Sequence, residues 1–236
     1  MARKTKHEAL ETRETILDAA ETLFLKRGVS HTSLQDIAAE AAVTRGAIYW
    51  HFKDKAELFD AMMNRATMPL EEGMSLHAAA DPALSLVALR WGLVNVFYST
   101  MYRERTRRVF EIAMSKVEYT GEMQPLQERK LAAHRDWRAQ NRATFERAIA
   151  LGQLPPSLAC ESAAIALVAL VDGLIHQWIM DPSSFDLMLV GQAAVERFLD
   201  SLTNSGTPML PPLTELERAR FGQEGPCQDP ASRPSP

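Results

Sequence analysis

The segment TRGAIYWHFKDK, residues 44–55, concentrates side chains that can contact nucleic acid bases. Arginine can donate two parallel hydrogen bonds to the edge of a guanine, whereas alanine and tyrosine side chains can contact thymine methyl groups. Arg45, Ala47 and Tyr49 are therefore candidates for reading base edges, and Trp50 is expected to share their exposed surface.

A second set of residues has the chemistry of phosphate binding. Hydroxyl, imidazole and ammonium groups donate hydrogen bonds to phosphate oxygens, and helix N-termini add backbone N–H donors. Gly46 has no side chain, so a duplex could approach its backbone closely. The candidate phosphate ligands are Ser33, Thr44, His51 and Lys55, and Arg3, Lys4 and Lys6 form a basic arm ahead of the first predicted helix.

Two short helices joined by the connector 41–43 are predicted to hold these residues. The first helix begins at a capping box, formed either by Thr32 with Gln35 or by Ser33 with Asp36. Such lengths are typical of a helix-turn-helix, whose second helix places its N-terminal residues in the major groove of DNA.

The second short helix is predicted to begin at Arg45, with Thr44 as its N-cap and Val43 packed on Ile48 as a hydrophobic staple. Ile48 and Phe52, four residues apart, form its inward pair. An aromatic-rich helix taken alone is more often a packing element. The spacing of caps, staple and connector favours a surface for DNA, because a globular protein has no folding reason to expose these side chains.

Helical spacing continues on both sides of this unit. A first helix over 8–27 is predicted to stop at Gly28 in a left-handed conformation, and Asp54 with Glu57 caps a fourth helix. About five further helices follow, and strand patterns are nearly absent, so we predict an all-α fold. The expected division is a basic arm (1–8), a helix-turn-helix DNA-binding domain (9–55), a helical ligand-binding and dimerisation domain (56–204) and a disordered Pro-rich tail (205–236).

Composition points to an ordinary soluble protein of 236 residues, whose formal net charge of −4 gives no global signal for nucleic acid. Cys160 and Cys227 form neither a disulfide framework nor a metal-ligand spacing, which fits a reducing cytoplasm. The apolar run 163–180 contains Asp172 and His176, and these would be costly in lipid. We therefore expect a buried helix there and no membrane partner.

Catalytic signatures are missing from the sequence. No GxSxG, HExxH, P-loop or dinucleotide-binding pattern occurs, and the six histidines are scattered. We expect no catalytic residue, no metal and no cofactor, and an enzyme is the disfavoured alternative. A ligand-binding adaptor that has lost its DNA contacts is a second alternative.

Residues 12–59, TRETILDAAETLFLKRGVSHTSLQDIAAEAAVTRGAIYWHFKDKAELF, resemble the DNA-binding domain of the TetR family of transcriptional regulators. The resemblance implies an Ω-shaped homodimer on a palindromic double-stranded DNA operator, released when a small molecule binds the C-terminal domain. One position departs from the family pattern, because Ala42 stands where glycine is usual, and a positive φ there would cost on the order of 1 kcal/mol. The matching positions are Gly28, Thr32, Ile37, Ala38, Val43, Tyr49, His51, Phe52, Lys55 and Leu58.

The stretches KHEALETR, RTRRVFEIAMSKVE, GQLPPSL and ALVDGLIHQW resemble the AcrR/TtgR branch of that family, which represses multidrug efflux pumps. This implies a small hydrophobic or aromatic effector, and a regulator of a catabolic operon or an activator stays open. Thioether and aromatic side chains suit a pocket for varied apolar ligands, although simple core packing explains such residues equally well. The candidate ligand contacts are Trp91, Phe97, Phe110, Met114, Trp137, Asn141, Asp172 and His176.

Small residues recur on the last two predicted helices, over 158–180 and 185–202. Alanine and glycine at helical spacing allow close helix approach, which is consistent with a dimer interface. Asp172 and His176 lie one turn apart, so they could face a pocket or form a pair at that interface. The basic cluster 103–108 is expected to be a solvated loop and helix start.

Overall fold

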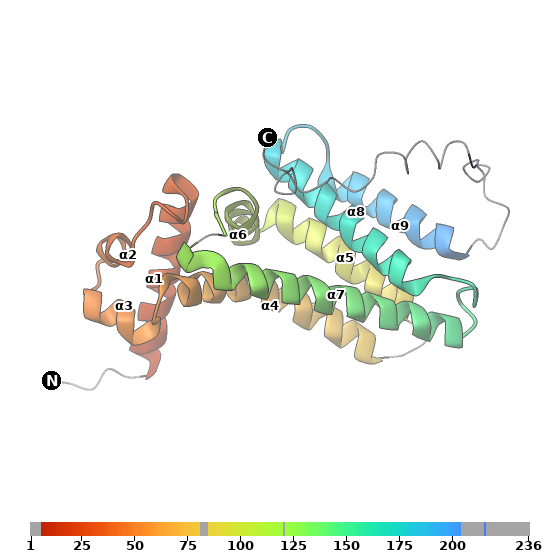
Figure 1. Ribbon diagram of the computed structural model, residues 1–236, viewed down its shortest axis with the longest axis horizontal. Coiled ribbons are helices and arrows are strands. Elements are labelled where there is room, and N and C mark those ends of the chain that lie inside the picture. The colour runs from red at the N-terminus through yellow and green to blue at the C-terminus, as the bar shows by residue number, and fades with distance from the viewer. Residues whose placement is uncertain (1–5, 81–84, 120, 204–214, 216–236) are drawn as a thin grey trace, which may run out of the picture. The chain divides into compact units, whose positions relative to one another are not determined.

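The structure is a computed structural model that describes residues 6–80, 85–119, 121–203 and 215 (Figure 1). The predictions for Arg3, Lys4 and the Pro-rich tail fall outside these described residues. All regular elements in the described part are helical, which confirms the all-α prediction. They are α1 (Lys6–Arg27), α2 (Leu34–Glu40), α3 (Arg45–His51), α4 (Lys55–Ala80), α5 (Ser85–Tyr102), α6 (Glu104–Ser115), the 3₁₀ turn η2 (Gly121–Met123), α7 (Gln124–Ala150), α8 (Cys160–Met180) and α9 (Leu187–Thr203).

The ends of the short helices follow the capping signals in the sequence. Ser33 and Asp36 form the capping box of α2: the Ser33 hydroxyl accepts from the Asp36 amide at 3.1 Å, and the Asp36 carboxylate accepts from the Ser33 amide at 2.9 Å. The Ser33 hydroxyl and the Ser33 amide both donate to the Asp36 carboxylate, which holds the pKa of Asp36 below its ordinary value. The Thr44 hydroxyl caps α3 by accepting from the Ala47 amide at 3.2 Å. Of the two boxes considered, the Ser33 box is the one that forms.

The connector between α2 and α3 has the strained backbone that the family pattern implies. Ala42 lies at φ +52°, in the left-handed region where glycine is favoured. The Val43 amide donates to the Ala38 carbonyl at 3.0 Å, which closes the turn. Gly28 ends α1 at φ +81°, as predicted. At the other end α1 already begins at Lys6, which therefore belongs to the helix and not to an arm ahead of it.

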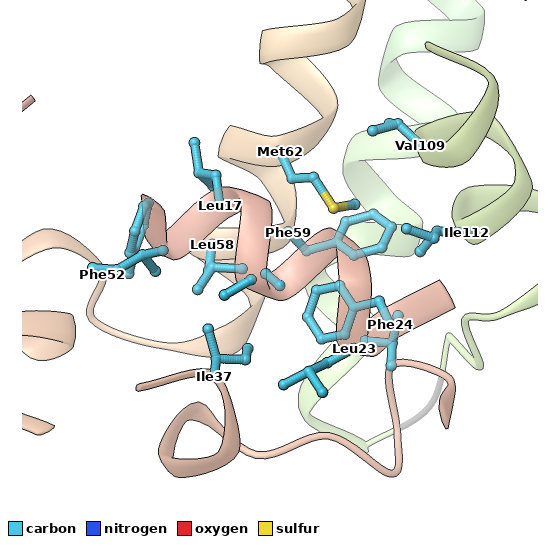
Figure 2. Close-up of a cluster of buried hydrophobic side chains, with 14 of the residues drawn as sticks. Leu17, Leu23, Phe24, Ile37, Phe52, Leu58, Phe59, Met62, Val109 and Ile112 are labelled. Carbon is cyan, nitrogen blue, oxygen red and sulfur yellow. The ribbon is translucent and has the colours of Figure 1, made fainter. Parts of the chain in front are cut away.

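The N-terminal core joins α1, α2 and α3 to the first half of α4 and to α6 (Figure 2). Its side chains interdigitate from all five helices, so the short helices are held against a larger scaffold. The core therefore continues past residue 55, where the expected domain boundary lies. The labelled members in Figure 2 are Leu17, Leu23, Phe24, Ile37, Phe52, Leu58, Phe59, Met62, Val109 and Ile112.

The C-terminal core lies among α5, α7, α8 and α9. Phe97 of α5 is fully buried there against Gly191 of α9, where an added Cβ would lie 2.6 Å from the ring. The absence of a side chain at Gly191 thus lets the two helices approach. In this structure Phe97 packs in the core, and its contact with a ligand stays a prediction.

Helix α8 is long and apolar enough to cross a membrane by length and composition alone. In this fold one face of the helix packs into the C-terminal core, with Leu167, Val171 and Trp178 buried. Its contacts with α7 and α9 account for this apolar face.

Helix α6 contributes to both cores. Val109 and Ile112 lie in the N-terminal core, whereas Phe110 and Met114 pack against the C-terminal core. These positions alternate between two faces of one helix, as the 3.6-residue period requires. A shift of α6 would therefore be felt in both cores.

Candidate nucleic-acid interface

Helix α3 is anchored by a narrow apolar edge and exposes the rest of its surface. Ile48 and Phe52 are buried in the N-terminal core, as predicted. The Tyr49 and Trp50 side chains are 48% and 72% exposed, and Arg45 is exposed as well. Large aromatic side chains held in solvent next to an arginine gain nothing from folding, so this surface is suited to binding.

Two ring contacts order this surface. The Arg45 guanidinium lies over the Tyr49 ring, 5.6 Å from its centroid. The Trp50 and His51 rings meet edge to face, with centroids 4.5 Å apart and an interplanar angle of 88°. A cation over an aromatic face at an exposed site is worth about 0.5–1 kcal/mol, so the arginine is held yet easily extended toward a base.

The small and polar residues near the start of α3 lie where a phosphate could reach them. Thr44 and Gly46 are exposed in its first turn, and Ala47 is half-buried. Ser33 is exposed at the N-cap of α2. Both helix starts therefore present backbone N–H groups to solvent beside a hydroxyl. His51 is half-buried, and its phosphate contact stays a prediction.

Lys55 has a structural role that the sequence did not indicate. Its side chain is buried, and its ammonium group donates to the Val29 carbonyl at 2.9 Å and to the Thr32 carbonyl at 3.0 Å. The Val29 amide in turn donates to the Lys116 carbonyl at 2.8 Å. Lys55 thus fastens the loop between α1 and α2 to the start of α4, and its phosphate contact stays a prediction.

Replacing Lys55 by methionine tests this structural role. We expect the free energy of unfolding to fall by about 1–3 kcal/mol, because two buried carbonyl groups lose their charged donor while the apolar stem is kept. Urea unfolding followed by circular dichroism measures the change. A variant as stable as the wild type would show that the ammonium group contributes nothing to the fold.

A cluster of charges ties α1 to α4. Arg65 of α4 is 10% exposed, and its guanidinium contacts Glu14 and Asp18 at 2.8 Å and also pairs with Glu21. The Glu21 side chain is 5% exposed. Charges buried this far from water are kept only when they are paired, so these four residues act as a unit.

The same cluster reaches α6 through Arg105, which lies 3.3 Å from Asp18 and 3.9 Å from Glu21. Burial raises the pKa of Glu21 above its ordinary value, while its hydrogen bond and charge interaction with Arg65 act in the opposite direction. The basic cluster 103–108 is therefore more than a solvated helix start. Arg105 joins α6 to the buried carboxylate of α1.

The predicted ligand contacts in the C-terminal half are placed unevenly. Phe110, Met114 and Trp137 are half-buried and pack against the C-terminal core, whereas the Trp91 side chain is exposed on α5. A ligand contact by these four residues stays a prediction. Two clefts with mostly polar linings lie elsewhere, along α1 and α6.

The three polar residues predicted to contact a ligand, Asn141, Asp172 and His176, have different surroundings. The Asn141 side chain is buried, and its amide nitrogen has no hydrogen-bond partner within the described residues. Asp172 pairs with His134 of α7 at 3.4 Å, and burial raises the pKa of Asp172 above its ordinary value. His176 is exposed on α8, and its contact with a ligand or with a second copy stays a prediction. Asn141 is thus the one buried polar residue among the predicted contacts.

Metal ligation has no support within the part of the chain that is described. No group of three or more His, Cys, Asp or Glu side chains there is arranged to hold an ion. The chemistry that remains at the N-terminal end is recognition of an extended anionic partner by exposed rings, an arginine and helix starts.

Comparisons with known proteins agree with this geometry. Residues 16–62 match the family described as "Bacterial regulatory proteins, tetR family", and residues 84–204 match "MAATS-type transcriptional repressor, C-terminal region". The transcriptional regulator TtgR of Pseudomonas putida is 40% identical over 201 residues, which span 85% of this chain and 94% of TtgR.

Two solved structures share the fold at useful identity. NalD, the secondary repressor of the MexAB-OprM multidrug efflux pump in Pseudomonas aeruginosa, has a TM-score of 0.76 and 36% identity over 85% of this chain and all of its own. SmeT of Stenotrophomonas maltophilia, in complex with triclosan, has a TM-score of 0.75 and 33% identity over 87% of this chain and all of its own.

These matches cover the helix-turn-helix and the helices that follow it. They agree with the anchored, solvent-facing α3 and with the rejection of an enzymatic role, because the family consists of regulators. The chain belongs to the tetR family of bacterial regulatory proteins and carries a MAATS-type repressor C-terminal region.

Proposed function

We propose that the protein represses a multidrug efflux operon in the cytoplasm and is released from its operator by a small hydrophobic molecule. The observation that carries this proposal is the exposed surface of α3, with Arg45, Tyr49 and Trp50 outward and Ile48 buried. The efflux assignment rests on the likeness to NalD over most of the chain. Arg45 would read a base edge, and Ser33 and Thr44 would position phosphates.

A homodimer is part of the proposal, because one short helix contacts too few base pairs for specific binding. Helices α8 and α9 carry exposed apolar side chains that a second copy would cover: Ile165, Met180, Leu189 and Val190. Two copies joined there would present two α3 helices to half-sites of a palindromic operator.

The effector is proposed to bind among α5, α6, α7 and α8, close to Asn141. A buried amide without a partner costs about 1–3 kcal/mol, and a ligand that accepts its hydrogen bond would recover part of that energy. Phe110 and Met114, one turn apart on α6, pack against the C-terminal core and offer adaptable apolar contacts. Triclosan, bound by the related SmeT, is a suitable probe because it joins two aromatic rings to one hydroxyl group.

Helix α6 provides a route from effector to DNA. It touches the C-terminal core through Phe110, the N-terminal core through Ile112 and the buried charges through Arg105. An effector that favours one position of α6 would change the placement of α1 and hence of α3. Release from the operator then requires only that the effector bind the two positions of α6 with different affinity.

Selection of duplexes from a random pool tests the function as a whole. We expect the wild-type protein to enrich a palindromic sequence and to release it when triclosan is added. A reporter gene placed behind the enriched sequence should be silent without the effector and expressed with it. Enrichment of no sequence, or stronger expression in the presence of the protein alone, would contradict the proposal.

Replacing Asn141 by leucine separates the ligand site from ordinary core packing. Calorimetry should show triclosan binding weakened about 10-fold or more, because the ligand loses a buried hydrogen bond worth about 1–1.5 kcal/mol. The free energy of unfolding without ligand should stay the same or rise, since an unpaired buried amide is removed. Unchanged triclosan affinity would place the effector away from α7.

A further inference from the structure

A cationic cleft of about 280 Å³ lies between the end of α1 and the segment that follows α6. It combines residues far apart in the sequence that the N-terminal core brings together. Its lining is Lys26, Arg27, Gly28, Ser30, His31, Ser115, Lys116, Val117 and Glu118. Three permanent cations and a histidine thus share the cleft with a single carboxylate.

The cations of this cleft make no close ion pair within the described residues, although the charge of Arg27 acts on Asp36. Neither Lys26, Arg27 nor Lys116 forms an ion pair within the described residues, whereas Arg105, earlier on α6, pairs with Asp18. Lys26 and Arg27 in the last turn of α1, and Lys116 at the C-cap of α6, are favoured by the helix dipoles. This interaction with the helix dipoles explains why the fold tolerates three cations here. Their charged groups can still bind an anion.

Hydrogen bonds to backbone groups beside the cleft hold its two lining segments together. The Val29 amide donates to the Lys116 carbonyl at 2.8 Å, and Lys55 holds the Val29 carbonyl from the other side. Gly28 takes φ +81°, which turns the chain at the cleft edge. Cations carried on a fixed backbone lose less conformational freedom on binding than cations on a flexible loop.

The cleft adjoins the proposed phosphate-facing start of α2. Arg27 is close enough to Asp36, in the first turn of α2, for its charge to favour the ionised carboxylate. His31 is two residues from Ser33, the N-cap of that helix. The donors that line the cleft therefore lead toward the start of α2, where Ser33 adds a hydroxyl and Asp36 a carboxylate.

We infer that this cleft binds backbone phosphates of the duplex outside the base pairs that α3 reads. The inference rests on the proposed DNA binding and extends it to a longer segment of the operator. Phosphate is the matching chemistry, because lysine, arginine and histidine donors converge without an apolar lining large enough for a drug. Contacts of this kind add affinity and salt dependence without adding base specificity.

Duplexes of two lengths test the inference. One ends at the outermost base pair of the sequence selected by the wild-type protein, and the other carries about six further base pairs on each side, roughly half a helical turn. Wild-type protein should bind the longer duplex about 10-fold more tightly. Its salt dependence should be steeper by about 0.9 in the logarithmic slope for each added phosphate contact.

The double variant Lys26→Ala with Lys116→Ala should bind the short duplex with the affinity of the wild type. It should not bind the longer duplex more tightly than the short one. Arg135→Ala with Arg147→Ala removes the same charge from exposed positions of α7 and should keep that gain. Thermal unfolding of both variants checks that each is folded. The inference would be overturned if the Lys26→Ala, Lys116→Ala variant still preferred the longer duplex as strongly as the wild type does.

The remaining outcomes separate this inference from the proposed function. If the protein binds the short duplex specifically and binds the longer duplex no more tightly, the inference about the cleft is overturned. The proposed repressor function would then stand. Binding of pyrophosphate in the cleft, detected by calorimetry and lost in the double variant, without any flank effect would also overturn it, in favour of a free phosphate ligand. Enrichment of no duplex at all would overturn both.

Discussion

Replacing Arg65 by alanine should lower the free energy of unfolding by about 3–5 kcal/mol, toward the lower end of that range. The substitution removes the guanidinium that pairs with the buried carboxylate of Glu21. Arg105 stays 3.9 Å from Glu21 and compensates in part. Urea unfolding at neutral pH measures the loss.

A second substitution identifies the buried charge as the cause. The double variant Arg65→Ala with Glu21→Gln should be more stable than Arg65→Ala alone, because no unpaired charge remains in the core. Glu21→Gln alone should change stability much less than Arg65→Ala. If the double variant is no more stable than Arg65→Ala, the loss comes from packing and not from Glu21.

The pH dependence has a definite sign. The pKa of Glu21 is raised in the fold above its ordinary 4.5, and loss of Arg65 should raise it further. The folded state then binds a proton that the unfolded state lacks, so its stability rises as pH falls through the raised pKa toward the ordinary value. The difference in free energy of unfolding between the wild type and Arg65→Ala should therefore become smaller as the pH is lowered from about 8 to about 5. If this difference became larger as the pH is lowered, Glu21 would not be the cause of the lost stability.

Arg45→Ala should weaken binding of the selected duplex by about 1–3 kcal/mol per half-site, hence by up to about 6 kcal/mol for a dimer on both half-sites. The guanidinium lies over the exposed Tyr49 ring at the start of α3, the part of a recognition helix that meets base edges. Binding of unrelated duplex should change far less, because a base contact and not a phosphate contact is lost. Titrations with selected and scrambled duplexes give both numbers.

Two properties should be untouched by Arg45→Ala. Arg45 is exposed and makes no contact with the N-terminal core, so the unfolding free energy should change by less than about 1 kcal/mol. The oligomeric state in sedimentation should match that of the wild type. Equal losses on selected and scrambled duplexes would make Arg45 a phosphate ligand and move base reading elsewhere on α3.

The sequence allowed the local geometry around α3 to be predicted. The left-handed Ala42 was expected from the family resemblance, because glycine is usual at that position. The caps at Ser33 and Thr44 and the buried pair Ile48 and Phe52 depend on residues within a few positions of one another. Short-range spacing carries enough information for such features, because a helix start or a buried edge is decided by its neighbours.

Contacts between distant residues could not be predicted in this way. Lys55 carries the charge of a phosphate ligand, yet it is folded onto carbonyl groups 23 and 26 residues earlier in the chain. Arg65 meets three carboxylates of α1 that resemble an ordinary acidic helix face in the sequence. The 3–4-residue spacing of Glu14, Asp18 and Glu21 was the one available signal, since it places them on a single face.

The division between the cores has a physical consequence for regulation. Because α6 packs into both cores and also binds α1 through Arg105, it would connect the proposed effector site to the N-terminal core that holds α3. Packed interfaces tend to have discrete arrangements, so a small displacement of α6 can change the placement of α1 as a unit. The same cluster that stabilises the fold would then also set the affinity for DNA.

Hydroxyl-radical oxidation read by mass spectrometry tests the central claim, that α3 presents its exposed rings to DNA. Tyr49 and Trp50 should be oxidised in the free protein and protected when the selected duplex is bound, in line with their exposure of 48% and 72%. Tyr98 and Tyr102 of α5, 46% and 59% exposed, provide the internal control and should be oxidised equally in both states. Undiminished oxidation of Tyr49 and Trp50 in the saturated complex would contradict the account.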